Sequence, residues 1–126
     1  MQTHEAIAPH EIRSIASHEK RSIRTLLWGL KPFSNLRGSF PLSYAVVFLT
    51  VAMEEGKPMG TYARELGLSR FNLSRYLRCI GDRGRNGTAG LGLVSVTRTE
   101  GHPIRTKVCL TDKGRALAEQ VFRNLR

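Results

Sequence analysis

The stretch ARELGLSRFNLSRYL, residues 63–77, places apolar residues at helical spacing on both sides of one glycine. Gly67 can adopt the positive φ that a tight corner between two helices requires. Ser69 can accept a hydrogen bond from the first free amides of the following helix. A helix-turn-helix needs a small contact residue, a left-handed turn and two buried side chains, and the residues at those spacings are Ala63, Gly67, Leu73 and Tyr76. The stretch therefore predicts two short helices that meet at a corner.

The second helix of this pair, about residues 69–82, has one apolar and one basic side. Leu73, Leu77 and Ile80 follow three- and four-residue steps and are predicted to point inward. The outward side carries Arg70, Phe71, Asn72, Ser74, Arg75 and Arg78. Residues 70–107 include eight basic side chains and two acidic ones, whereas a merely solvated helix usually mixes the two signs. We therefore expect the outward side to face nucleic acid.

A long amphipathic helix is predicted near the N-terminus. Apolar residues recur at three- and four-residue steps across residues 9–31, which is the period of a helix with one buried side. We expect this helix to start near Pro9 and to stop before Pro32, because proline lacks the N–H that a helix interior needs. The segment 33–41 is predicted to be a connection.

The next segment is apolar on nearly every side. LSYAVVFLTVAM, residues 42–53, predicts a central helix that other elements cover on most sides, and Gly56 is expected to end it. Pro58 fits the first position of the following helix, because the N–H that it lacks would be unpaired there anyway. That helix is predicted to run through Leu66.

A loop, a hairpin and a last helix follow the helix pair. GDRGRNGTAGLG, residues 81–92, is rich in glycine and predicts a flexible loop. LVSVTRTEGHPIRTKVCL, residues 93–110, alternates apolar and polar residues around a Gly-His-Pro turn and predicts a β-hairpin. TDKGRALAEQVFRNL, residues 111–125, predicts an amphipathic helix with Thr111 as its cap.

Composition and charge narrow the class of protein. The chain has 126 residues, enough for one compact domain, and its net charge of +10 attracts polyanions. It contains no apolar run of about 18 residues, no signal peptide and no lipidation motif, so no membrane partner is expected. Cys79 and Cys109 lack the spacing of a metal site or a disulfide framework, which favours a reducing cytoplasm.

In its order of elements the chain resembles the MarR-type winged-helix transcription regulators. The matching residues are YARELGLSRFNLSRYLRCIGDRG, then GLV after the loop, and then HPIRTKVCLTDKGRAL, which is similar to that family's wing arginine and the entry to its last helix. The resemblance implies a mainly α fold with a small β-hairpin. Within it, residues 42–110 form the DNA-binding winged helix-turn-helix with a wing at about 93–110, and residues 1–41 and 111–126 supply N- and C-terminal dimerisation helices.

Donor geometry assigns roles on double-stranded DNA. Arg70 can bind guanine O6 and N7 and Asn72 can pair with adenine, so these two residues are expected to read sequence. Ser74, Arg75 and Arg78 are expected to bind phosphates, and Ser69 can do so besides capping the helix. On the wing, Arg105 is the candidate for insertion into the minor groove, with His102 and Lys107 near the backbone; the alternative is a solvated hairpin tip. Phe71 either touches a thymine methyl group or packs against neighbouring protein. The predicted DNA-binding residues are Ser69, Arg70, Asn72, Ser74, Arg75, Arg78, Arg98, His102, Arg105 and Lys107.

The first and last helices carry apolar stripes longer than one small domain can cover, which predicts a twofold homodimer. The expected dimerisation residues are Ile12, Ile15, Ile23, Leu117, Val121, Phe122 and Leu125. The prediction is a sequence-specific transcription regulator, a dimeric repressor that reads an inverted repeat. The alternatives are a phage or plasmid replication or packaging protein with a winged helix, or a winged-helix module that binds a protein. No enzyme is predicted, because paired carboxylates, a nucleophile triad and a cofactor fingerprint are all missing.

Weaker patterns allow further hypotheses. The loop lacks a P-loop ending, so an extended loop is favoured over a phosphate cradle, with a DNA-contacting arm through Arg83 and Arg85 as the other alternative. No cofactor or metal is predicted, since the N-terminal histidines lack ligand spacing. Cys79 is either a small buried thiol, which is favoured, or a site of oxidation. The aromatic residues that form core, or line the cavity of a small-molecule effector, are Trp28, Phe33, Phe40 and Tyr44.

Overall fold

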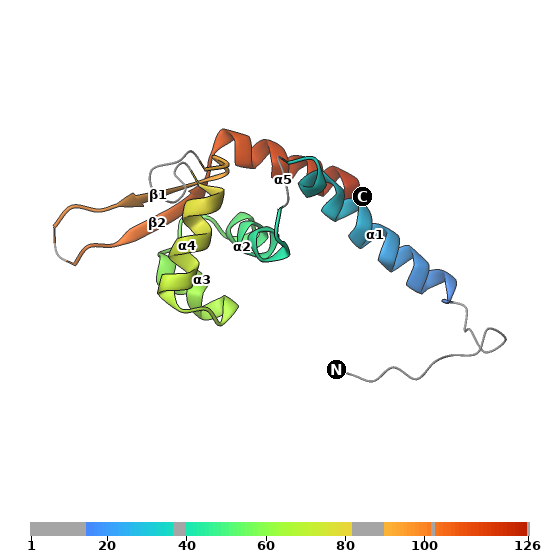
Figure 1. Ribbon diagram of the computed structural model, residues 1–126, viewed down its shortest axis with the longest axis horizontal. Coiled ribbons are helices and arrows are strands. Elements are labelled where there is room, and N and C mark those ends of the chain that lie inside the picture. Colours follow the sequence, from blue (N-terminus) through green and yellow to red (C-terminus); the bar gives the residue numbers. More distant parts are fainter. Residues whose placement is uncertain (1–14, 37–39, 82–89, 102, 126) are drawn as a thin grey trace.

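The computed structural model describes residues 15–36, 40–81, 90–101 and 103–125. Its elements are α1 (Ser17–Ser34), α2 (Leu42–Met53), α3 (Met59–Leu66), α4 (Arg70–Ile80), β1 (Val94–Arg98), β2 (Thr106–Leu110) and α5 (Asp112–Leu125). The long helices α1 and α5 lie side by side at one end, the hairpin β1–β2 extends from the other, and α2, α3 and α4 lie between them (Figure 1). The expected mainly α fold with a small β-hairpin is confirmed.

The path of α1 differs from the prediction at both ends. The helix begins at Ser17, where the side chain of Glu19 accepts a hydrogen bond from the Ala16 backbone N–H at 2.9 Å. Residues 9–14 of the expected helix lie outside the described residues. The prediction that the helix stops before Pro32 is wrong, because α1 continues through that proline to Ser34.

A contact from the far end of the chain explains why Pro32 does not end the helix. Proline at this position removes the N–H that would donate to the carbonyl of Trp28, four residues earlier. The side-chain amide of Asn124, on α5, donates to that carbonyl at 2.9 Å instead. Buried Gly29 lets the two helices approach closely, since a Cβ there would lie 2.6 Å from Leu125 Cδ2.

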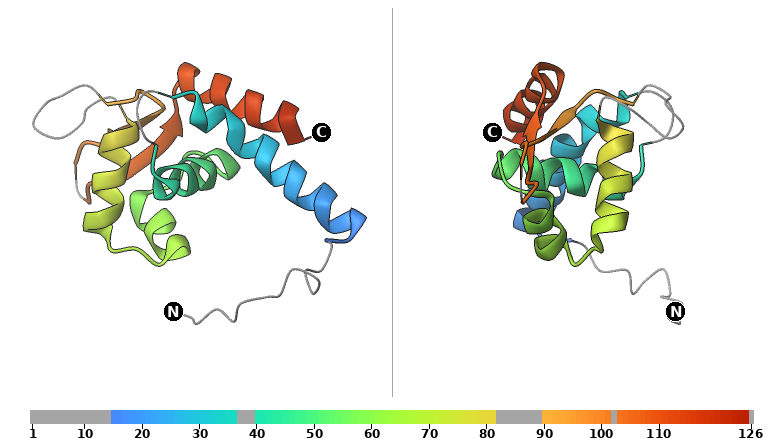
Figure 2. Two further views of the ribbon diagram at one scale, coloured as in Figure 1. Left: turned by 45° about the vertical axis from the view of Figure 1, so that its right-hand side comes forward. Right: turned by 90° about the vertical axis from the view of Figure 1, so that its left-hand side faces the viewer.

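The central helix α2 has the predicted bounds, and its side chains Ala45, Val47, Phe48 and Val51 are buried. As expected, other elements cover it on most sides, and the remaining side exposes Leu42, Val46 and Met53. In the two views of Figure 2, α2 lies between the α1–α5 pair and the α3–α4 pair. It therefore joins the two halves of one hydrophobic core.

The helix-turn-helix has the predicted corner. Gly67 adopts φ +67°, and the Leu68 N–H donates to the Ala63 carbonyl at 2.9 Å, which closes the end of α3. The Ser69 hydroxyl oxygen caps α4 by accepting from the Asn72 N–H at 3.0 Å. Pro58 is the residue before α3 rather than its first residue, a shift of one position.

The buried side of α4 is also as predicted. Leu73, Leu77 and Ile80 are buried, whereas Tyr76 is only partly buried and makes an edge contact with Tyr44 at 5.7 Å between ring centroids. The expectation that Tyr76 is one of two buried side chains is therefore met only in part. These contacts hold α4 against α2 and α3 with its other side outward.

The hairpin is antiparallel, with Val94 paired to Leu110 and Arg98 paired to Thr106. Its base is held by the chain on both sides. The Leu93 N–H donates to the Ile80 carbonyl at 2.7 Å, and the Val108 N–H donates to the Lys57 carbonyl at 3.1 Å. These bonds make the hairpin a rigid extension of the helix pair.

The start of α5 confirms the predicted cap, because the Thr111 hydroxyl oxygen accepts from the Gly114 N–H at 3.0 Å. Glu55, which follows α2, connects that segment to the end of β2 and to α5. One of its carboxylate oxygens accepts from the Leu110 N–H at 2.8 Å, and the other lies 2.7 Å from Nη1 of Arg115. Of the expected flexible loop, residues 81–92, the segment 82–89 lies outside the described residues, whereas at its end the Gly92 N–H donates to the Gly81 carbonyl at 2.7 Å.

Candidate nucleic-acid interface

The outward side of α4 is cationic and contains no acidic residue. Its exposed side chains are Arg70, Phe71, Arg75 and Arg78, and its partly buried ones are Asn72 and Ser74. The Arg75 guanidinium reaches the Asn72 side-chain oxygen at 3.5 Å. The amide nitrogen of Asn72 has two N–H donors, so this contact leaves it able to donate to a base.

Phe71 lies on the side of α4 opposite the buried leucines, because a helix turns by about 100° per residue. Its side chain is 71% exposed. The alternative in which this ring packs against neighbouring protein is therefore wrong. The outward side of α4 therefore offers an exposed apolar ring together with three exposed arginines.

The wing places its cations near the end of the hairpin. Arg98, Arg105 and Lys107 are all exposed, and His102 lies outside the described residues. The Arg105 backbone N–H donates to the Thr99 hydroxyl oxygen at 2.9 Å, and the Thr99 N–H donates to the Arg105 carbonyl at 2.9 Å. The backbone from which the Arg105 side chain projects is thereby fixed.

Strand alternation separates these cations into two sets. Arg98 lies on the same face of the hairpin as Val94 and Val96, which is the face that meets α4. Lys107 is paired with Thr97 and so lies on the other face. The structure therefore joins Arg98 to the basic side of α4 and keeps Lys107 apart from it.

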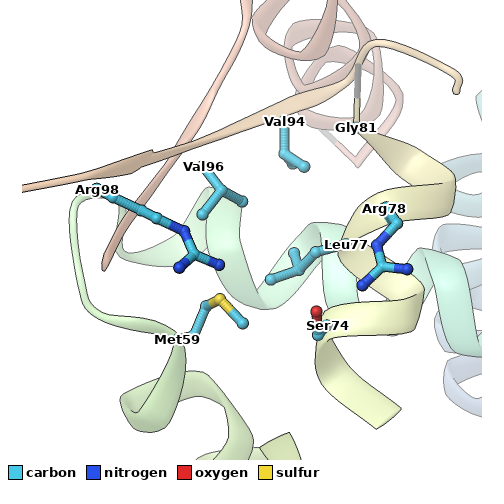
Figure 3. Close-up of a pocket in the computed structure, with 8 residues that line it drawn as sticks. All are labelled: Met59, Ser74, Leu77, Arg78, Gly81, Val94, Val96 and Arg98. Carbon is cyan, nitrogen blue, oxygen red and sulfur yellow. The ribbon is translucent and has the colours of Figure 1, made fainter. Parts of the chain in front are cut away.

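A hollow of about 490 Å³ separates α4 from β1, and we call it the helix–wing notch. Its lining residues are Met59, Ser74, Leu77, Arg78, Gly81, Val94, Val96 and Arg98. Figure 3 shows the guanidinium groups of Arg78 and Arg98 on opposite sides of the notch, with Leu77 between them. Sequence spacing did not single out Met59 or Val96, since only the folded chain brings them beside these arginines.

No family model matches the chain, and no curated protein matches it. Solved structures do share its fold. AbfR in its disulfide form is 22% identical over 84% of this chain and 66% of its own, with a TM-score of 0.58. The transcriptional repressor CouR, solved on a 23-mer DNA duplex, is 22% identical over 86% of this chain and 70% of its own, with a TM-score of 0.56.

A MarR family protein from Bacillus stearothermophilus is 20% identical over 84% of this chain and 66% of its own, with a TM-score of 0.55. This chain has the MarR-type winged-helix fold. It spans about two thirds of the length of AbfR and of the Bacillus protein. Among the described residues, no helix combines the length and apolarity needed to cross a bilayer.

In this MarR-type fold the two terminal helices leave much apolar surface uncovered. Leu117 and Val121 are buried within the chain itself, and Ile12 lies outside the described residues. The large apolar residues that α1, α5 and the residues just before α1 expose are Ile15, Ile23, Leu26, Leu27, Trp28, Phe122 and Leu125. Sequence reasoning did not assign Leu26, Leu27 and Trp28 to this surface.

The predicted aromatic group is mostly core in the MarR-type fold. Phe33 is buried and stacks on Phe40 with 5.4 Å between ring centroids, whereas Trp28 is exposed. Phe33 and Phe40 also line a second hollow of about 400 Å³, and a small-molecule effector stays a prediction.

Cys79 is partly buried, and its hydrogen bond with the Tyr44 hydroxyl is the main cause that raises the pKa of that tyrosine.

Proposed function

We propose that the chain is a DNA-binding transcription regulator that inserts α4 into the major groove of a duplex. The observation that carries this proposal is the outward side of α4, which offers three exposed arginines and no acid. Ion pairs among the described residues join Lys57 to Glu54, Arg115 to Glu55, and Arg123 to Glu119. The arginines of α4 are therefore not neutralised by acids of the described chain.

The expected roles follow from where the side chains lie. Arg70 and Asn72, in the first turn of α4, are placed to read base edges, since the start of a recognition helix enters the major groove most deeply. Arg75 and Arg78 are one and two turns further along and are suited to phosphate oxygens. Arg105 on the wing would enter the adjacent minor groove.

The proposed assembly is a twofold dimer formed by α1 and α5. Seven large apolar side chains are exposed there, and burying them against a second copy would remove them from water. Such a dimer would set two copies of α4 about one DNA turn apart, roughly 34 Å, and would read an inverted repeat. We propose a repressor, because a dimer that covers a promoter blocks access to it; CouR is described as a repressor and was solved on DNA.

Selection of bound fragments from random duplex DNA tests the proposal. The expected result is an enriched inverted repeat whose half-sites are about one helical turn apart. An Arg70→Ala variant should relax the preference at one base pair and bind about 5- to 150-fold more weakly, a cost of roughly 1–3 kcal/mol. An Arg75→Ala variant should weaken binding to all sequences alike.

Three outcomes would contradict parts of this proposal. No retention on DNA at about 100 mM salt would favour a protein-binding module, since specific complexes survive physiological salt. Enrichment of an origin-like array of repeats would favour a replication or packaging protein. Sedimentation at micromolar concentration that shows only a 14.1 kDa species would rule out the dimer.

A further inference from the structure

The helix–wing notch brings two unpaired cations to one hollow. Arg78 comes from the last turn of α4 and Arg98 from the end of β1, and neither forms an ion pair among the described residues. Among the described residues, none that lines the notch is acidic. Two guanidinium groups on opposite sides of one hollow repel each other, and an anion between them would turn that repulsion into attraction.

The rest of the lining says what kind of anion fits. Val96, which is 38% exposed, offers an apolar surface between the arginines, whereas Leu77 and Val94 are buried, and the Ser74 hydroxyl lies at the edge (Figure 3). The occupant should therefore carry a negative group beside an apolar body. A deoxyribose-phosphate unit has both, because its sugar presents C–H groups and its phosphate oxygens accept from arginine.

The groove geometry of DNA places such a unit there. If α4 lies in the major groove and the wing tip lies in the adjacent minor groove, one sugar-phosphate strand separates the two grooves and must cross between α4 and β1. We propose that this strand crosses the helix–wing notch and that Arg78 and Arg98 bind the same phosphate from opposite sides. The inference rests on the proposed function and assigns one shared contact within it.

The notch is held open by backbone contacts before any DNA arrives. Gly81 and Val94 form an isolated bridge, which joins the end of α4 to the start of β1. A Cβ on Gly81 would lie 2.6 Å from the Leu77 carbonyl oxygen, so a glycine is needed for this close approach. Because both arginines project from elements fixed to one another, only their side chains need to become ordered when the phosphate binds.

A scan with neutral phosphates tests the proposal. In the duplex selected by the unmodified protein, each phosphate is replaced in turn by a methylphosphonate, and affinity is measured for the wild type, Arg78→Gln and Arg98→Gln. In the wild type, one position between the major-groove and minor-groove contacts should weaken binding by about tenfold or more, because two charge-assisted contacts are lost there. In each variant the same position should lose part of its sensitivity, because one arginine still contacts the phosphate, and in the double variant Arg78→Gln/Arg98→Gln it should lose most of it.

Lys113→Gln provides the matched control, since it removes one positive charge from an exposed position in the first turn of α5, outside both the helix–wing notch and the exposed apolar residues proposed to pair two copies. Its methylphosphonate profile should equal that of the wild type. If Arg78→Gln and Arg98→Gln silence different positions, or silence none, the shared phosphate is refuted while the proposed function stands. Failure of the wild type to bind any duplex would instead refute the proposed function.

Discussion

Replacement of Phe71 by alanine is expected to weaken DNA binding and to leave the fold intact. The ring is 71% exposed, so the folded chain alone gains little from it. Full burial of a phenylalanine side chain is worth about 1.5–3 kcal/mol, and the exposed share of this ring is therefore worth about 1–2 kcal/mol when DNA covers it. The dissociation constant should rise by about 5- to 30-fold.

The chemical partner of the ring can be identified in the DNA. Phenylalanine in the major groove meets the methyl group of thymine, and one buried methyl group contributes about 0.8 kcal/mol, or roughly fourfold in affinity. A scan that replaces each thymine of the selected duplex by deoxyuracil should reveal such a position with the wild type. With Phe71→Ala that position should no longer matter.

Leu42→Ala is the matched control, because Leu42 is 67% exposed on α2 and lies outside the proposed interface. It should change neither the affinity nor the deoxyuracil profile. Both variants should unfold at the denaturant midpoint of the wild type. Identical deoxyuracil profiles for Phe71→Ala and the wild type would refute the thymine contact.

The remaining predictions concern salt, the corner, the proline and pH. If each protomer neutralises about four phosphates, a plot of the logarithm of the binding constant against the logarithm of salt concentration should have a slope near −7 for the dimer. A flat plot, measured by fluorescence anisotropy, would contradict the electrostatic account. Gly67→Ala should lower the free energy of unfolding by about 1–2 kcal/mol, because alanine is strained at a φ of +67°. No atom of the described residues crowds the added Cβ, so this backbone strain is the expected cause, and an unchanged urea midpoint would show that the corner relaxes. Asn124→Leu should lower the free energy of unfolding by about 1 kcal/mol in the wild type and by much less in Pro32→Ala, where the restored N–H can donate to the Trp28 carbonyl. Equal losses in the two backgrounds would exclude this compensation. Burial raises the pKa of the Tyr62 hydroxyl above the ordinary tyrosine value of about 10, so the unfolded chain loses this proton at lower pH than the folded chain does. Stability should therefore fall as the pH rises past that ordinary value, and the fall should be smaller in Tyr62→Phe.

Local chemistry explains why the helix pair could be predicted. The positive φ of Gly67, the cap at Ser69 and the buried leucines of α4 each depend on residues within about one helical turn of each other. The hairpin and the Thr111 cap could also be predicted from the sequence, because strand alternation and helix capping depend on residues that are close in the chain. The candidate DNA-binding arginines of α4 followed once its buried side was known.

Contacts between distant segments decided what the sequence pattern missed. Pro32 indicates a helix end when only its neighbours are considered, yet Asn124 supplies the missing donor from another helix. In the same way, nothing in the spacing of Leu117 and Val121 shows whether they cover this chain or a second copy. Burial depends on the packing of whole elements, so pattern alone predicts which side is apolar but not what covers it.

By itself the sequence determined the helix-turn-helix, the wing hairpin and the sign of the charge on their outer surface, because turns, caps and periodicity are set by near neighbours. Only the tertiary structure decided that Phe71 stays exposed and that Arg78 and Arg98 face one hollow. The reason is physical: β1 reaches α4 through backbone contacts at its base, such as the bond from the Leu93 N–H to the Ile80 carbonyl, and side chains twenty residues apart meet only once the chain has folded.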